Sequence, residues 1–153
     1  QIETDPSVRA ALFLALVAQG SLAAVEVLAE ILHAEDAGLR NGAIDALAAL
    51  PEQAATVLDR LLADPDPGMR MFGVLLAGDL PLPGIELTLF ALLNGEQDPN
   101  VCATLLEVLL GRGQPLPATL HAATAHRFRT DPFVQFLLSD AQVLESASPG
   151  ERS

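Results

Sequence analysis

Hydrophobic residues recur at helical spacing after five aspartates, which are Asp5, Asp36, Asp66, Asp98 and Asp131. The third, seventh and eleventh positions after each aspartate lie on one face of an α-helix. All are apolar or small except Gln142, and they are Val8, Leu12 and Leu16; Leu39, Ala43 and Leu47; Met69, Gly73 and Ala77; Val101, Leu105 and Leu109; and Val134, Leu138 and Gln142. The stripe predicts helices near residues 6–19, 37–50, 67–78, 99–111 and 132–145.

The aspartates themselves are helix start signals. An Asp carboxylate accepts hydrogen bonds from the N–H groups of the first turn, which have no partner within the helix. Proline follows four of the five, and at the first helical position its missing N–H costs nothing. We therefore expect an Asp-capped helix at each site.

A second helix is expected in each repeat, near residues 21–34, 51–63, 83–94 and 115–127. Proline lies at or near three of these starts, at Pro51, Pro83 and Pro115. The segments are apolar on most sides, as expected of helices that are buried by stacking.

The repeated unit defines the organisation of the chain. The steps from Asp to Asp are 31, 30, 32 and 33 residues, which is typical of a solenoid of stacked helical units. We predict one domain over residues 1–145, with repeats near 5–35, 36–65, 66–97, 98–130 and 131–145. The polar segment 146–153 is predicted to be disordered. No polar outer cap precedes the first helix, so we interpret the chain as part of a longer array.

Composition supports an all-α fold and disfavours some classes of binding partner. Half of the residues are hydrophobic, only 4% are aromatic, and Ala and Leu dominate. The formal net charge is −12, which disfavours nucleic acid and anionic membrane surfaces. No apolar run is long enough for a membrane span. A cytoplasmic location is favoured, and the oligomeric state is not indicated.

The phrase Asp-Pro-x-Val-Arg before an Ala/Leu-rich helix resembles the HEAT repeat, and most of all the short bacterial phycobilisome-lyase type. It is clearest at residues 64–70, and the resemblance covers residues 5–142, with Cys102 and Gln135 departing from the Arg position. The resemblance implies an all-α, right-handed α-solenoid of about four and a half helix pairs, whose Asp-capped helices line the concave side.

Three repeats place Arg four residues after the capping Asp, and we call these pairs the Asp–Arg ladder. Its members are Asp5 and Arg9, Asp36 and Arg40, and Asp66 and Arg70. The spacing places both side chains on one helix face, and each Arg can also reach the Asp of the next repeat. A structural role is favoured over a row of arginines that binds an anionic ligand, because each Arg has a carboxylate nearby.

Helix phase also predicts a partner-binding groove beside the apolar stripe. Residues five and nine positions after each Asp should flank the stripe. The groove residues are Leu14, Asn41, Asp45, Met71, Leu75, Glu107, Phe136 and Asp140. A surface with apolar side chains and three carboxylates suits an amphipathic helix or an extended peptide with basic residues. The alternative is that these side chains complete the packing between repeats.

Catalytic and metal-binding signatures are missing from the sequence. No nucleophile elbow or phosphate-binding loop occurs, and His121 and His126 are not at a ligating spacing. We therefore expect a non-catalytic protein–protein interaction module or scaffold without metal or cofactor. The alternative function, suggested by the resemblance, is an accessory subunit of a bilin or related prosthetic-group lyase.

Overall fold

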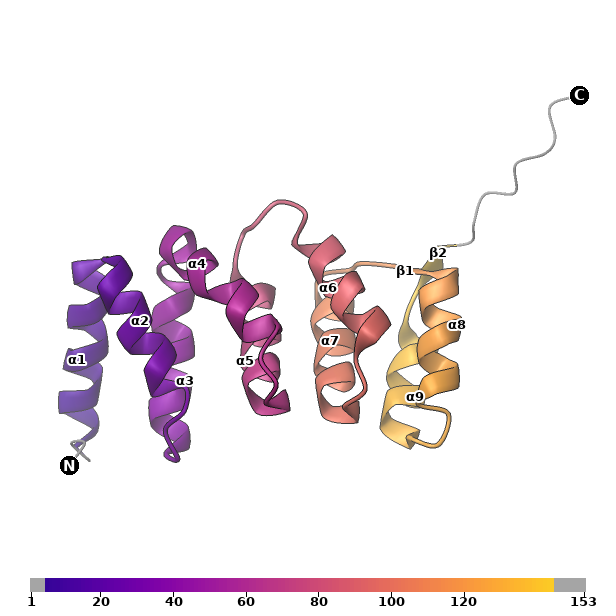
Figure 1. The fold of residues 1–153 in the computed structure, drawn as a ribbon, viewed down its shortest axis with the longest axis horizontal. Coiled ribbons are helices and arrows are strands. Elements are labelled where there is room, and N and C mark those ends of the chain that lie inside the picture. Colours follow the sequence, from indigo (N-terminus) through magenta and orange to yellow (C-terminus); the bar gives the residue numbers. More distant parts are fainter. Residues whose placement is uncertain (1–4, 145–153) are drawn as a thin grey trace, which may run out of the picture. The chain divides into compact units, whose positions relative to one another are not determined.

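The computed structural model describes residues 5–144, which form nine helices and two short strands (Figure 1). The helices are α1 (Pro6–Gln19), α2 (Leu22–Ile31), α3 (Ala37–Ala48), α4 (Pro51–Leu62), α5 (Pro67–Asp79), α6 (Ile85–Gly95), α7 (Pro99–Gly111), α8 (Ala118–Arg127) and α9 (Pro132–Asp140). The strands are β1 (Leu116–Pro117) and β2 (Val143–Leu144). The chain is thus an all-α solenoid of helix pairs, as the sequence predicts.

All five aspartates cap helices, which confirms the predicted start signals. A carboxylate oxygen of each accepts a hydrogen bond from a backbone N–H two or three residues later, at 2.8–3.1 Å. Each cap residue is itself in extended conformation, so its carboxylate can turn back over the first turn. The caps therefore fix where α1, α3, α5, α7 and α9 begin.

Several other helix ends differ from the prediction, for local reasons. Helix α3 ends at Ala48 rather than at residue 50, because Leu50 precedes Pro51 and is displaced from helical geometry (φ −124°, ψ 59°). Helix α2 ends at Ile31 rather than at residue 34. Helix α6 begins at Ile85 rather than at Pro83, since Gly84 between them has a left-handed φ of 74°.

The prediction was also wrong near the C-terminal end, where two strands replace expected helix. Strand β1 pairs in parallel with β2, with Leu116 opposite Val143 and Pro117 opposite Leu144. Helix α8 therefore begins at Ala118 rather than at residue 115, and α9 ends at Asp140 rather than at residue 145. The tail expected to be disordered, residues 146–153, lies outside the described residues.

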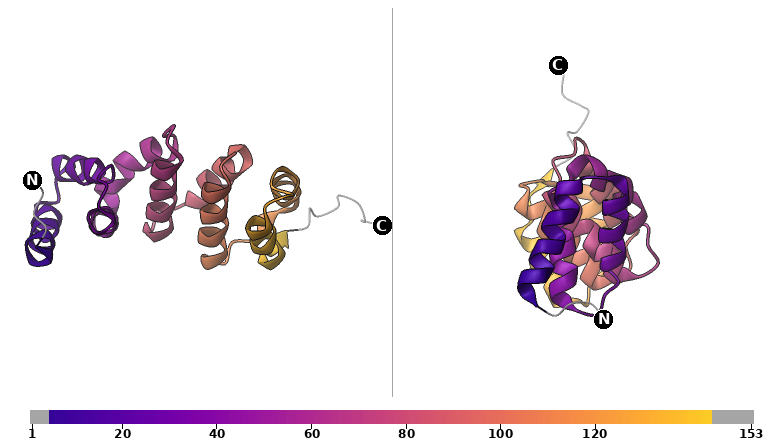
Figure 2. Two further views of the ribbon diagram at one scale, coloured as in Figure 1. Left: turned by 90° about the horizontal axis from the view of Figure 1, so that it is seen from below. Right: turned by 90° about the vertical axis from the view of Figure 1, so that its left-hand side faces the viewer.

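Backbone contacts divide the chain between Pro83 and Gly84 into two compact units. In unit 1, which ends at Pro83, helices α1, α3 and α5 form one layer and α2 and α4 form the other (Figure 2). In unit 2, which begins at Gly84, α7 packs on α9 and α6 packs on α8. The sequence predicts a single domain and gives no sign of this division, which separates α5 from α6 within the expected repeat 66–97.

Candidate partner-binding surface

A hollow of about 330 Å³ lies between α1 and α3 in unit 1. Its α1 side is built from large side chains and its α3 side mostly from small ones. The lining residues are Phe13, Leu14, Val17, Gly42, Asp45, Ala46 and Ala49. Two of them, Leu14 and Asp45, belong to the predicted groove.

The hollow exists because α3 carries small residues along one stripe. Gly42, Ala46 and Ala49 are spaced i, i+4 and i+7, so they lie on the same face of the helix. Phe72 and Leu76 occupy the positions of Gly42 and Ala46 in α5, so the next repeat does not carry this stripe. These small residues are not among the predicted groove residues, although their helical spacing is visible in the sequence.

Gly42 also sets the position of the Phe13 ring, which forms part of the lining. A Cβ atom at Gly42 would overlap the ring of Phe13, so only glycine permits this approach. The Phe13 ring therefore lies directly against the backbone of α3. The base of the hollow is apolar, and the Asp45 carboxylate stands exposed at its edge.

The five groove residues of unit 1 are accessible to different degrees. Leu14 is 70% exposed and Leu75 is 40% exposed. Asn41 and Asp45 are exposed, and Met71 is half-buried. Unit 1 thus presents aliphatic and acidic side chains on its Asp-capped helices.

Unit 2 holds the other three groove residues. Phe136 on α9 is 58% exposed, and Glu107 on α7 and Asp140 on α9 are also exposed. Asp140 borders a second hollow, of about 210 Å³, with Leu110, Gly113 and Gln114. The predicted groove residues are therefore distributed over both units, and each unit has its own hollow.

The Asp–Arg ladder joins the first repeat to the second through Arg9 and Asp36. Arg9 donates two hydrogen bonds to Asp36, from Nη1 to Oδ1 at 3.1 Å and from Nη2 to Oδ2 at 3.0 Å. These bonds hold the pKa of the Asp36 carboxyl below its ordinary value, with further help from the Leu39 N–H. Arg9 therefore links the first repeat to the helix cap of the second.

Arg40 and Arg70 donate hydrogen bonds to backbone carbonyls. Arg40 Nη1 donates to the carbonyls of Ala34 and Glu35, at 2.7 and 2.6 Å. Arg70 Nη1 donates to those of Asp64 and Pro65, at 2.9 and 3.1 Å. Both arginines thus satisfy carbonyls in the connection that leads from one repeat to the next.

The two repeats without the ladder Arg satisfy such carbonyls by other means. Arg127 on α8 donates to the carbonyls of Leu93, Asn94 and Glu96, at the end of α6. Gln135 donates to those of Ala125 and Phe128, at 3.0 and 3.1 Å. The same function is therefore kept while the residue that performs it changes.

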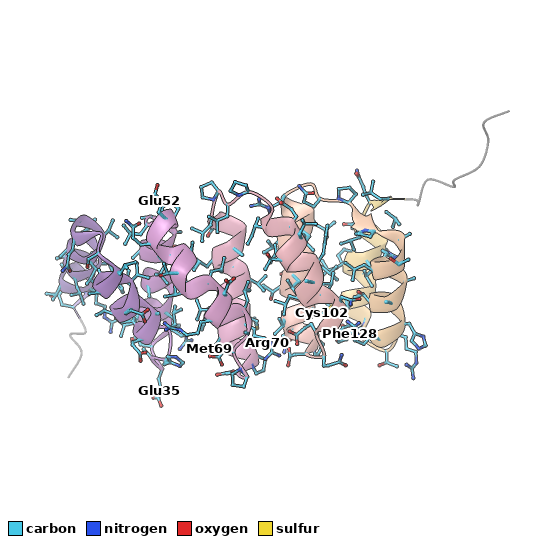
Figure 3. The ribbon with its side chains drawn as sticks, turned by 45° about the horizontal axis from the view of Figure 1, so that its top comes forward. Glu35, Glu52, Met69, Arg70, Cys102 and Phe128 are labelled. Atoms are coloured by element: carbon cyan, nitrogen blue, oxygen red, sulfur yellow. The ribbon has the colours of Figure 1, made fainter. Side chains whose placement is uncertain are left out.

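Cys102, at the fourth ladder position, is fully buried in unit 2 (Figure 3). Burial raises the pKa of its thiol to about 12, although the charge of Arg127 acts in the opposite direction. The thiolate is the reactive form of cysteine, so this side chain is a poor nucleophile at neutral pH.

The comparisons with known proteins identify the repeat. Residues 2–72 match the family model described as HEAT repeats. This stretch of the chain therefore consists of HEAT repeats. No curated protein matches it. The matched segment covers the first two repeats and the start of α5, so the HEAT family match includes both walls of the α1–α3 hollow.

HEAT repeats mediate protein–protein interaction and scaffolding, so the partners of this chain are expected among proteins. In the stretch from Asp5 to Leu144, no helix is long and apolar enough to cross a membrane.

Proposed function

We propose that this HEAT-repeat chain is a non-catalytic binding module whose Asp-capped helices receive a helix or peptide of a partner protein. The hollow between α1 and α3 is the observation that carries the proposal. It would take an aliphatic side chain of the partner as an anchor, because its base is apolar and Leu14 stands exposed beside it.

Charge predicts a second property of the partner segment that carries the aliphatic anchor. Asp45 stands at the edge of the hollow, and the chain as a whole has a net charge of −12. A Lys or Arg next to the anchor residue of the partner would meet the Asp45 carboxylate. The partner segment is therefore amphipathic, with basic residues flanking its apolar face.

The absence of catalysis is part of the same proposal. The three ladder arginines bond to the protein itself, and Cys102 is buried with a raised pKa. Neither group is thus arranged to act on a substrate, and this supports binding over chemistry.

A pull-down with matched leucine variants tests the proposal. Leu14→Glu places a charge beside the hollow, whereas Leu87→Glu places the same charge on α6 at nearly equal exposure, 72% against 70%. We expect the wild type and Leu87→Glu to capture the same protein from the source lysate, and Leu14→Glu to lose it. Circular dichroism of both variants verifies that they remain folded. Equal capture by Leu14→Glu and Leu87→Glu would show that the hollow is not the binding site.

A further inference from the structure

Unit 1 carries a row of three exposed side chains that crosses its Asp-capped helices. Leu14, Asp45 and Leu75 each lie nine positions after the capping Asp, on α1, α3 and α5 respectively. Helix α3 packs against both α1 and α5, so Asp45 lies between the two leucines (Figure 1). We call these three residues the crossing row.

The crossing row stays exposed where the repeats are stacked. Asp45 is exposed although α3 has a packed helix on each side, and its sequence neighbours Ile44 and Ala46 are only 8% and 5% exposed. On α5, Leu75 is exposed whereas Leu76, which follows it, is buried. The ninth position therefore points away from the packed helices, and its exposure does not arise from an end of the stack.

A partner that contacts both leucines has to cross α3. Packed helices lie about 8–10 Å apart, so Leu14 and Leu75 are separated by two such steps, or about 16–20 Å. A segment that ran along a single helix would contact only one of the two. The first step ends at Asp45, whose carboxylate pairs best with Lys or Arg. The crossing row thus fits a segment with an aliphatic, a basic and an aliphatic side chain at equal steps.

The length of the step selects the conformation of that segment. In a polyproline II helix, three residues make one turn and rise about 9 Å, so every third side chain lies on the same face. A β-strand covers about 10 Å in three residues, but the third side chain then lies on the opposite face. An α-helix covers about 9 Å in six residues without returning to the same face, and seven residues span about 10.5 Å. Polyproline II is the conformation that matches both the step length and the face.

We propose that the crossing row binds an extended polyproline II segment of another protein, in which a Lys or Arg has an aliphatic residue three positions before it and three positions after it. The first aliphatic side chain enters the α1–α3 hollow beside Leu14, the basic one meets Asp45, and the second aliphatic one covers Leu75. This binding mode uses the hollow of the proposed function and rests on it, but it requires α5 as well.

A second copy of this chain does not supply such a segment. All eight basic residues are Arg, and none of them has Leu, Ile or Val both three positions before it and three positions after it. The net charge of −12 on each copy also opposes their association. The partner is therefore a different protein.

A labelled proline-rich peptide tests the binding mode directly. The probe is Leu-Pro-Pro-Lys-Pro-Pro-Leu with a fluorescent label at its N-terminus, and its binding to the full chain is followed by fluorescence anisotropy at physiological salt. We expect weak but saturable binding, because proline pre-orders the polyproline II conformation. Two peptides with steps of two or four residues, Leu-Pro-Lys-Pro-Leu and Leu-Pro-Pro-Pro-Lys-Pro-Pro-Pro-Leu, should bind at least about fivefold more weakly, since their side chains do not share a face.

Matched variants locate the peptide on the crossing row. Leu75→Glu should weaken binding of the probe about tenfold or more, because it places a charge against an aliphatic side chain. Leu87→Glu on α6 introduces the same charge outside the row and should leave the affinity unchanged. Asp45→Lys should weaken binding of the probe about fivefold and should strengthen binding of the same peptide with Glu in place of Lys. Glu107→Lys reverses an exposed charge at the ninth position of α7 and should have neither effect.

Four results would overturn this binding mode. The first is no saturable binding of the probe by the wild type. The second is equal affinity of the wild type and Leu75→Glu, which would show that the peptide does not cross α3. The third is equal affinity for the three step lengths. The fourth is tighter binding of an Ala-rich helical peptide that carries Leu, Lys and Leu seven residues apart.

The proposed function can stand when this binding mode fails. Capture of a partner that is lost in Leu14→Glu and kept in Leu75→Glu would retain the hollow as the binding site and remove the crossing over α3. Equal capture by Leu14→Glu and Leu87→Glu would remove both.

Discussion

Gly73→Ala is the substitution that tests the packing between repeats most sharply. Gly73 lies in the middle of α5, where alanine normally stabilises a helix by about 1 kcal/mol relative to glycine. Here the added Cβ would meet α4 at three atoms, 3.0 Å from the Leu61 Cβ, 3.0 Å from the Leu62 Cδ2 and 3.1 Å from the Leu62 backbone nitrogen. The last of these belongs to the helix backbone and cannot move aside alone.

The balance of two effects sets the expected magnitude. Extra volume in a well-packed contact costs about 1–3 kcal/mol. After subtraction of the helix gain of about 1 kcal/mol, we expect Gly73→Ala to lower the free energy of unfolding by about 0–2 kcal/mol. Gly111→Ala is the matched control, because a Cβ at Gly111 would meet nothing within 4 Å. This control should gain up to about 1 kcal/mol, so the two variants should differ by up to about 3 kcal/mol.

Urea denaturation followed by far-ultraviolet circular dichroism measures both values. The chain contains no Trp and no Tyr, so intrinsic fluorescence is a poor probe. If the two units unfold in separate transitions, Gly73→Ala should move the transition of unit 1 and Gly111→Ala that of unit 2. A Gly73→Ala protein as stable as Gly111→Ala, or more stable, would refute the close approach of α4 and α5.

Three further predictions concern charge and burial. Asp36→Asn keeps the helix cap but removes the charge paired with Arg9, so the wild type should be more stable than this variant at neutral pH. Because the pKa of Asp36 is lowered, the stability advantage of the wild type should be lost as the pH falls below the ordinary carboxyl value of 3.8. Cys102 should react with a thiol reagent at mildly alkaline pH far more slowly than a free thiol, because it is buried and its pKa is about 12. Arg127→Met should destabilise unit 2 by about 1–3 kcal/mol, because carbonyls at the end of α6 lose their charged donor.

Each of these predictions has a contradicting result. The Asp36 account fails if the advantage of the wild type over Asp36→Asn persists unchanged well below pH 3.8. Labelling of Cys102 at the rate of an unfolded control would show that the thiol is accessible. For Arg127, the matched control is Arg129→Met, since Arg129 is exposed and makes a long bond of 3.5 Å to the His126 carbonyl. Equal stability losses in the two arginine variants would contradict the assigned role of Arg127.

The sequence predicted what depends on nearby residues. The Asp caps act within one turn, so Asp5 through Asp131 could be placed as helix starts from the sequence alone. The apolar stripe likewise predicted the buried face of α3, because Leu39, Ala43 and Leu47 share one side of a helix. The predictions that were wrong concern contacts between residues that are distant in the sequence. The pairing of β1 with β2 joins Leu116 to Val143, and no local pattern marks either strand.

The candidate site was predicted only in part, for a similar reason. Helix phase indicated that Leu14 and Asp45 would lie outside the stripe, and both line the α1–α3 hollow. The hollow itself depends on the meeting of Phe13 with Gly42, and which helices meet is a tertiary property. Arg127 was similarly missed as a carbonyl donor, because its acceptors lie 31–34 residues earlier in the chain.

Photocrosslinking from inside the proposed site tests the central claim most directly. A photoreactive amino acid replaces Leu14 beside the hollow in one protein and Leu87 on α6 in another, and each is irradiated in the source lysate. The account predicts a crosslinked protein partner from position 14, located at an aliphatic residue next to a Lys or Arg, and none from position 87. A partner that crosslinks from position 87 and not from position 14 would contradict it.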